Sequence, residues 1–185
     1  MKLVCGITGS TGGVGKRLIK YKNFKFKKFN GNITNKKQVK KWIQKNKFDV
    51  FIHLAAIVPT KKVEEQYNFS KKVNVNGTKN IFNNLVKYQE KNLKWFFFPS
   101  TCHVYDSSLK KNLNEKSLIK PMSKYGETKM MCEKYLKRKL KKSKIKCCIG
   151  RVFSFTHSSQ SMDFLVPALK KKIKKKNKNF SIRES

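Results

Sequence analysis

The segment Lys2-Leu3-Val4-Cys5-Gly6-Ile7-Thr8-Gly9-Ser10-Thr11-Gly12-Gly13-Val14-Gly15 opens a chain of 185 residues and indicates its architecture. Its first residues are mostly apolar and predict a short strand, and Gly9, Gly12 and Gly15 follow at the spacing G-x-x-G-x-x-G. A helical stretch over residues 16–21 comes next. A glycine turn between a strand and a helix is typical of sites that hold the pyrophosphate of a dinucleotide at a helix N-terminus.

Strands and helices alternate along the rest of the chain. Strands are predicted at residues 24–29, 49–56, 93–99, 145–150 and 180–182. Helices are predicted at 35–46, 63–92, 123–143 and about 164–175, with Thr34 as the cap of the first. This alternation predicts βαβ units in an α/β protein, with a Rossmann-type, doubly wound parallel sheet.

The charge is strongly unbalanced, because 45 Lys and Arg residues stand against 10 Asp and Glu residues, a net charge of +35. Only four of the basic residues are arginines, and arginine is the preferred residue for bidentate contacts with bases and phosphates. The excess is therefore interpreted as a solvated lysine surface, without a specific nucleic-acid partner. Weak polyanion binding at low salt is expected, most of all at Lys170–Lys178.

The chain has no apolar run near the roughly 20 residues that a membrane helix needs. Its N-terminus is too short for a signal peptide, so we expect a cytoplasmic protein without a membrane partner. The cysteines have neither zinc-site nor C-x-x-C spacing, so they are expected to be free thiols, mostly buried, with no metal site. They are Cys5, Cys102, Cys132, Cys147 and Cys148.

A second motif, Tyr125-Gly126-Glu127-Thr128-Lys129, places a phenol and an ammonium on one face of a predicted helix. A nearby ammonium and an oxidised nicotinamide ring would favour the phenolate. In a parallel sheet, ligands bind at the carboxyl ends of the strands, so Thr101, which follows a buried strand, is expected at the reacting oxygen. Taken alone, the pair also fits an ordinary amphipathic helix in a lysine-rich chain.

One part of the usual dinucleotide motif is missing. An acidic residue about 20 positions after the glycines normally binds the adenosine ribose, but the first acidic residue here is Asp49. The cofactor is expected to be NAD or NADP, with NADP slightly favoured, because the cations of this region would not repel its 2′-phosphate. These cations are Lys16, Arg17, Lys25, Lys27 and Lys28. The alternative is a shortened second strand with little selectivity.

In combination, these motifs resemble the extended short-chain dehydrogenase/reductases, which are the NAD-dependent epimerase/dehydratase family acting on nucleotide sugars. The likeness covers most of residues 1–170. The matching segments are Thr8–Gly15, His53–Ala56, Asn74–Thr78, Ser100–Tyr105 and Tyr125–Lys129. Pro121, Ser123 and Glu133 also match.

The resemblance implies roles for individual residues. Thr101, Tyr125 and Lys129 would be catalytic, and Thr101, Ser154 and Gln160 would contact the substrate. Asn32 stands where the family usually has an aspartate near adenine. The implied cofactor contacts are Gly9, Gly12, Gly13, Val14, Gly15, Asn32, Ile33, Leu54, Ala55, Ala56, Asn74, Tyr125, Lys129 and Phe153.

The resemblance also implies a reaction, which is hydride transfer at C4 of a nucleotide-linked hexose. Dehydratases of the family carry acidic groups after the catalytic threonine, so Cys102 and His103 favour reduction or epimerisation. His103 is either a second acid/base or a bystander. Residues 151–167 look similar to the corresponding stretch of GDP-4-keto-6-deoxymannose reductases, although Ser154 and His157 depart from that pattern.

The resemblance implies a domain plan and an assembly as well. Residues 1–150 would form the NAD(P)-binding domain, and residues 151–185 the start of a truncated substrate-binding lobe. Relatives often pair through helices equivalent to Val73–Asn92 and Ser123–Ser143, which makes a homodimer one possible assembly, although the sequence itself does not specify the oligomeric state. A cofactor-binding remnant without turnover and a non-enzymatic polyanion-binding protein remain the alternatives.

Overall fold

The computed structural model describes residues 2–108, 112–153, 155–156, 160, 162 and 166–173. Contacts divide the chain into two compact units, Met1–Phe153 and Ser154–Ser185. In the second unit, residues 166–173 form a helix. The strand predicted at 180–182 lies outside the described residues.

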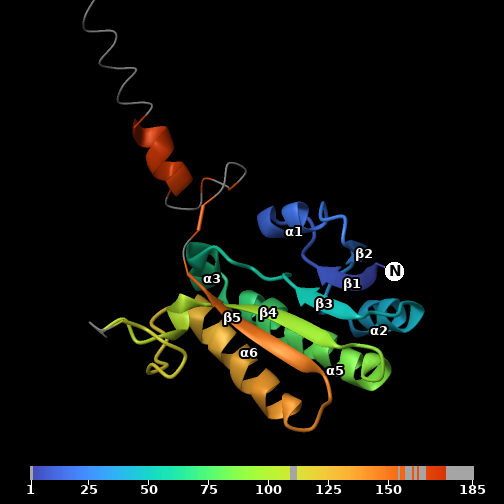
Figure 1. The fold of residues 1–185 in the computed structure, drawn as a ribbon. Coiled ribbons are helices and arrows are strands. Elements are labelled where there is room, and N and C mark those ends of the chain that lie inside the picture. The colour runs from blue at the N-terminus through green and yellow to red at the C-terminus, as the bar shows by residue number, and fades with distance from the viewer. Residues whose placement is uncertain are drawn as a thin grey trace, which may run out of the picture. The chain divides into compact units, whose positions relative to one another are not determined.

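The first unit is built on a five-stranded, entirely parallel sheet in the order β2-β1-β3-β4-β5 (Figure 1). This confirms the predicted Rossmann-like α/β fold. The third strand is shorter than predicted and ends at His53, because the N–H of Ala55 donates to the side-chain hydroxyl of Thr8 and not to the main chain of a neighbouring strand. The strands are β1 (Leu3–Thr8), β2 (Phe24–Phe29), β3 (Val50–His53), β4 (Trp95–Thr101) and β5 (Lys146–Val152).

Right-handed crossovers place α2, α5 and α6 on one face of the sheet and α1 on the other (Figure 1). Between α4 and α5 the chain forms a π-helical turn, η1, and after β4 a 3₁₀ turn, η2. The helical elements are α1 (Gly13–Leu18), α2 (Lys36–Lys45), α3 (Thr60–Glu65), α4 (Tyr67–Lys71), η1 (Lys72–Gly77), α5 (Thr78–Gln89), η2 (Cys102–Val104) and α6 (Lys124–Leu140). No helix in the described part of the chain is long and apolar enough to cross a membrane.

Two helices begin at polar residues whose side chains cap the first turn. The side chain of Asn35 accepts the N–H of Gln38 and starts α2. The prediction of Thr34 as this cap is wrong, because the hydroxyl of Thr34 donates to the side chain of Asn32 instead. Ser123 accepts the N–H of Gly126 and caps α6, the helix that carries the Tyr–Lys motif.

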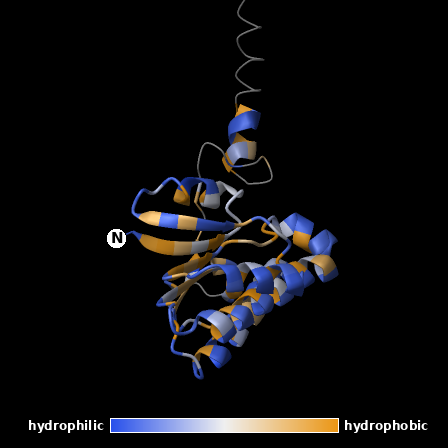
Figure 2. Ribbon diagram, turned by 90° about the vertical axis from the view of Figure 1, so that its right-hand side faces the viewer, coloured by the Kyte–Doolittle hydropathy of each residue, from blue (hydrophilic) through white to orange (hydrophobic). Residues whose placement is uncertain are grey.

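The core lies between the sheet and the three helices on one face (Figure 2). Phe51, Phe82 and Phe96 are fully buried there, and each buried aromatic ring contributes about 1.5–3 kcal/mol. The apolar run at residues 95–98 predicts a core position for Trp95 as well, but this side chain is 44% exposed. Alternation along β4 turns Trp95 to the face that carries α1, where the described residues of the first unit leave this side chain partly exposed.

The five cysteines are free, as predicted. Cys5 and Cys132 are buried, whereas Cys102, Cys147 and Cys148 are half-buried. Burial raises the pKa of Cys5 and of Cys147 to about 12. These two thiols therefore behave as small apolar side chains at neutral pH.

Candidate active site

The glycine loop after β1 is tightly folded against its neighbours. Gly9 has a φ of 70°, and a Cβ there would lie 2.6 Å from the backbone nitrogen of Ala55. A Cβ on Gly15 would lie 2.3 Å from the carbonyl oxygen of Gly9. At Gly12, in contrast, a Cβ would meet only that same oxygen, at 3.4 Å. The fold thus requires glycine at positions 9 and 15 but leaves room for a side chain at position 12.

A buried chain of hydrogen bonds runs from Thr78 through His53 to Thr8, the last residue of β1. The hydroxyl of Thr78 donates to the carbonyl of Asn74 (2.6 Å), so its oxygen is free to accept the Nε2–H of His53 (3.0 Å). Nδ1 of His53 then accepts the hydroxyl of Thr8 (2.7 Å), whose oxygen accepts the N–H of Ala55 (3.2 Å). This order assigns the Nε2–H tautomer to the imidazole.

His53 is neutral at physiological pH. Burial lowers its pKa to about 3, and the charge of Lys129 acts in the same direction. The imidazole therefore serves as a fixed connector between β1 and α5, with one donating and one accepting nitrogen.

Asn74, in the π-helical turn η1, holds the segment after β3 in place. Its Oδ1 accepts the N–H of Ile57 (2.8 Å), and its Nδ2 donates to the carbonyl of Ile57 (3.0 Å) and the hydroxyl of Thr128 (3.3 Å). The predicted cofactor contact thus has both ends of its amide bonded to protein. π-Helical turns are frequent at functional sites, and this one links the β3 loop to α6.

The Tyr–Lys motif lies against the carboxyl end of β4. Nζ of Lys129 donates to the carbonyl of Pro99 (2.9 Å) and lies 4.7 Å from the centre of the Phe98 ring. The same nitrogen lies 5.8 Å from the centre of the Tyr125 ring. The side chains of both Tyr125 and Lys129 are buried, so the predicted pair shares one face of α6 at this edge.

The electrostatics of the pair differ from the expectation. Burial raises the pKa of Tyr125 to about 12, with smaller contributions from Cys102 and Cys132. Burial also lowers the pKa of Lys129 to about 8. In the protein alone, the effect of burial on the pKa of Tyr125 is thus larger than that of the Lys129 ammonium, which donates to the Pro99 carbonyl. The phenol therefore keeps its proton at neutral pH.

Thr101 lies at the end of β4 and caps η2. Its hydroxyl oxygen accepts the N–H of His103 (3.2 Å), which leaves the hydroxyl proton available as a donor. The His103 ring lies edge-on to the Tyr125 ring at 6.1 Å. A Cβ on Gly126 would lie 2.2 Å from the His103 carbonyl oxygen, so glycine lets α6 pack directly on η2. This packing brings Thr101, Tyr125 and Lys129 to one edge of the sheet.

A buried ion pair, which the sequence motifs do not predict, joins α6 to β5 close to the end of β4. The guanidinium of Arg151 bonds the carboxylate of Glu133 at 2.8 and 3.1 Å, and that carboxylate also accepts the hydroxyl of Ser100 (2.5 Å). The carboxylate raises the pKa of Arg151. A usable signal was present: Arg151 is one of four arginines in a chain that otherwise uses lysine, and only arginine forms a planar bidentate pair.

The other predicted contacts are more scattered. Oδ1 of Asn32 accepts the N–H and the hydroxyl of Thr34, and Ile33 is buried. Phe153 is 55% exposed, with its ring 6.4 Å from that of Tyr105. Gly13 and Val14 begin α1, while Leu54, Ala55 and Ala56 follow β3 and are half-buried. Ser154 lies outside the described residues, and Gln160 belongs to the second unit.

Comparisons with known proteins identify the family and the fold. The sequence model of the family described as "NAD dependent epimerase/dehydratase family" matches residues 5–183. The chain is 28% identical over 161 residues to a dTDP-D-glucose 4,6-dehydratase of Dictyostelium discoideum, covering 81% of this chain and 36% of the relative. It is 29% identical over 190 aligned residues to a GDP-6-deoxy-D-talose 4-dehydrogenase of Aggregatibacter actinomycetemcomitans, covering 95% and 61%.

A solved structure, that of RMD from Pseudomonas aeruginosa complexed with NADPH, has the same fold. The TM-score is 0.78 at 18% identity, and the match covers 88% of this chain and 57% of the other. The chain therefore spans less than two thirds of the length of each of these three proteins.

Proposed function

Since this chain belongs to the NAD dependent epimerase/dehydratase family, we propose that it transfers a hydride between a nicotinamide cofactor and C4 of a nucleotide-linked hexose. The observation that carries the proposal is the meeting of a buried phenol, a buried ammonium and a capping hydroxyl at the carboxyl end of β4. The glycine loop lies at the same edge of the sheet, after β1. The names of the two curated relatives, which both refer to nucleotide-linked sugars, support the substrate class.

The residues of the glycine loop fit a dinucleotide. Gly9 and Gly15 are explained by contacts inside the protein, but Gly12 is not, because its Cβ direction is nearly free. A ligand that approaches the backbone there explains the missing side chain, and a pyrophosphate beside the start of α1 is such a ligand. A bound cofactor of this class supplies or accepts the hydride.

The protein's own groups would handle the proton. A phenol with a pKa of about 12 is a proton donor at neutral pH, which suits reduction of a sugar ketone. Thr101 would orient the same sugar oxygen with its free hydroxyl proton. Lys129 would hold the nicotinamide ribose and, when ionised, assist loss of the phenolic proton in the opposite direction.

Two finer assignments belong to this proposal. The segment before Asp49 lacks a carboxylate, so we expect NADP to bind slightly better than NAD. Cys102 and His103 stand where dehydratases carry acids, so we expect reduction or epimerisation of a GDP-linked deoxyhexose instead of water loss.

The proposal also includes a domain plan and an assembly. Residues 1–150 would bind the cofactor, and residues 151–185 would begin the substrate lobe. Two copies would pair through α5 and α6.

The test is turnover of GDP-4-keto-6-deoxymannose with NADPH and with NADH, alongside cofactor quenching of tryptophan fluorescence. Turnover with either cofactor supports the proposal. Quenching without turnover identifies a cofactor-binding remnant, the alternative to the proposed enzyme. Neither quenching nor turnover in a folded sample contradicts both.

A further inference from the structure

Two asparagines of the chain, Asn30 and Asn76, are each followed by a glycine. In this dipeptide the backbone nitrogen of the glycine can attack the side-chain carbonyl carbon of the asparagine, because no side chain blocks its approach. The nitrogen gives up its proton as it bonds to that carbon, the bond from the carbon to the amide nitrogen breaks, and ammonia leaves. Water then opens the cyclic imide to aspartate or isoaspartate, so a carboxylate replaces the amide in both products.

The structure leaves Asn30 able to react in this way. It is the first residue after β2, both Asn30 and Gly31 are exposed, and the chain bends at Gly31. Within the described part of the chain, neither the side-chain amide of Asn30 nor the N–H of Gly31 has a hydrogen-bond partner. No such bond therefore holds the amide carbon away from the attacking nitrogen.

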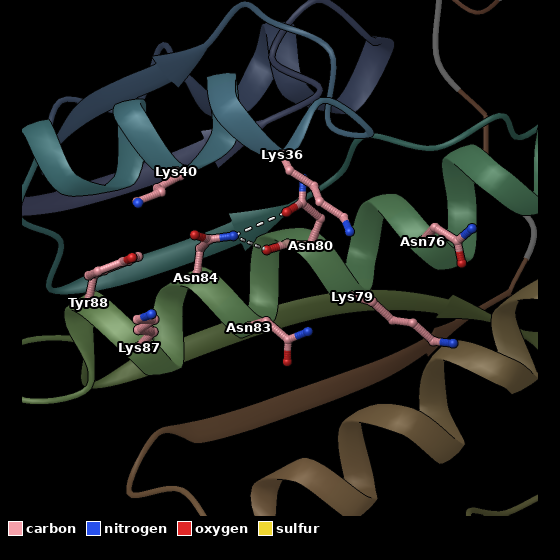
Figure 3. A pocket seen from close by; sticks show the side chains of 9 residues that line it. All are labelled: Lys36, Lys40, Asn76, Lys79, Asn80, Asn83, Asn84, Lys87 and Tyr88. Atoms are coloured by element: carbon pink, nitrogen blue, oxygen red, sulfur yellow. Dashed lines mark hydrogen bonds between the residues drawn. The ribbon is translucent and has the colours of Figure 1, made fainter.

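Asn76 has the same neighbour but a constrained backbone, although its side chain is exposed too. It lies in the π-helical turn η1, which continues into α5 (Figure 3). In a helical backbone the Cα–Cβ bond tilts toward the N-terminus, so the side chain points away from the nitrogen of the next residue. Gly77 is buried, and a Cβ there would lie 2.5 Å from Cδ1 of Ile33, so this segment has little room to rearrange.

Asn32, a second amide after β2, is protected in other ways. Its Oδ1 accepts the N–H (2.9 Å) and the hydroxyl (2.8 Å) of Thr34. The residue that follows it, Ile33, is β-branched and buried. Reactivity is therefore expected at Asn30 and not at its neighbour.

The position of Asn30 gives a carboxylate there a meaning. β1 and β2 pair in parallel with Thr8 opposite Phe29, so Asn30 follows β2 at the level where Gly9 follows β1 (Figure 1). Neighbouring strands lie about 4.8 Å apart, which places Asn30 at the same edge as the glycine loop. Dinucleotide-binding turns are normally followed about 20 residues later by a carboxylate for the adenosine ribose, and Asn30 comes 21 residues after Gly9.

We propose that Asn30 is a site of spontaneous deamidation, and that the carboxylate formed there replaces the missing acidic partner of the adenosine ribose. The second part rests on the proposed function. The unmodified amide tolerates the 2′-phosphate of NADP, whereas a carboxylate repels this phosphate and accepts hydrogen bonds from the ribose hydroxyls of NAD. Deamidation would therefore move the cofactor preference from NADP toward NAD as the protein ages.

Mass spectrometry of tryptic peptides tests the chemistry. Asn30 and Asn76 fall in separate peptides, residues 29–36 and 73–79, so Asn76 serves as the control within the same sample. The folded protein is incubated and sampled over time, and a second sample is incubated unfolded in guanidinium chloride. A sample digested without incubation corrects for deamidation during the digestion.

In the folded protein we expect Asn30 to deamidate at least about tenfold faster than Asn76, because reaction at Asn76 first requires local opening of η1. In the unfolded chain the two rates should converge, since the backbone constraint is gone. Similar rates at both residues of the folded protein, or an Asn30 that stays intact, would overturn the modification site.

Three variants test the consequence for the cofactor. Asn30→Asp represents the aspartate product, and Asn30→Gln retains an amide in a longer side chain that does not close the same ring. Asn92→Asp is the matched control, because it adds the same charge at an exposed residue before β4, at the opposite end of the strands. Matching melting temperatures show that all three fold, and quenching of tryptophan fluorescence measures NADPH and NADH binding.

We expect the ratio of NADPH to NADH affinity to fall at least about tenfold in Asn30→Asp relative to Asn30→Gln, with no change in Asn92→Asp. An equal ratio in Asn30→Asp and Asn92→Asp would overturn the assignment of Asn30 to the ribose. If the folded parent binds neither dinucleotide, the proposed function and the ribose assignment both fail, while the peptide masses still decide whether Asn30 is a modification site.

Discussion

Lys129 donates a 2.9 Å hydrogen bond from Nζ to the main-chain carbonyl of Pro99, two residues before the end of β4. This bond ties the ammonium to the strand instead of to the phenol of Tyr125, whose ring centre is 5.8 Å away. Under the proposed function, a ligand at the strand end would lie beside both groups.

Replacement of Tyr125 by phenylalanine should remove the proton donor and leave the ring packing in place. We expect turnover to fall by about 10²–10⁴-fold, the usual contribution of a general acid, with NADPH affinity unchanged. Steady-state kinetics with fluorescence titration measures both. Undiminished turnover in Tyr125→Phe would show that the phenol takes no part in the reaction.

Gly9→Ala and Gly12→Ala should separate folding from cofactor binding. Alanine at position 9 would need a positive φ and would clash with Ala55, so we expect a loss of more than about 1 kcal/mol in unfolding free energy. Alanine at position 12 has space within the protein, so we expect normal stability but weakened dinucleotide binding. If Gly12→Ala bound NADPH like the parent, the pyrophosphate would not approach that residue.

Lys129→Met should change how stability depends on pH. The pKa of Lys129 falls from 10.5 to about 8 on folding, so the unfolded chain binds this proton more tightly. The resulting penalty, about 3 kcal/mol, is fully present below pH 8 and disappears as pH rises to 10.5. The stability of the variant relative to the parent should therefore drop by about that amount between pH 7 and 10.5 in urea unfolding. A constant difference across this range would contradict the burial of a charged Lys129.

Glu133→Gln should be among the most destabilising single substitutions in the chain. It would leave the guanidinium of Arg151 without its carboxylate, and such a loss costs about 3–5 kcal/mol. A double-mutant cycle with Arg151→Met should show strong coupling, because the second substitution removes the unpaired charge. Independent, additive effects in urea unfolding would mean that the two residues do not depend on each other.

Much of the fold could be predicted from local patterns. Apolar runs bounded by turns marked the strands, and Ser123, a polar residue directly before an amphipathic helix, marked the start of α6. The cap of α2 was predicted one residue too early, because Asn32 competes for the hydroxyl of Thr34. Such competition depends on the turn geometry and not on the residue types alone.

The candidate site could be predicted in its members but not in its electrostatics. Tyr125 and Lys129 share a helix face because of their spacing, which the sequence states directly. The direction of their pKa shifts depends on how deeply tertiary packing buries them, and this information lies outside the motif. The pair of Glu133 and Arg151 was missed for a similar reason, since its partners come from α6 and β5 and meet only after the sheet forms.

The exposed apolar side chains of β1 and β4 make the solubility of the protein depend on ionic strength. With a net charge of +35, copies of the protein repel one another strongly in dilute buffer. At 1 M salt the repulsion reaches only about 3 Å, and Leu3 and Trp95, both more than two fifths exposed, can then meet the same side chains of another copy. Concentrated salt should accordingly precipitate this protein sooner than it would a protein of the same charge without exposed apolar side chains on its sheet.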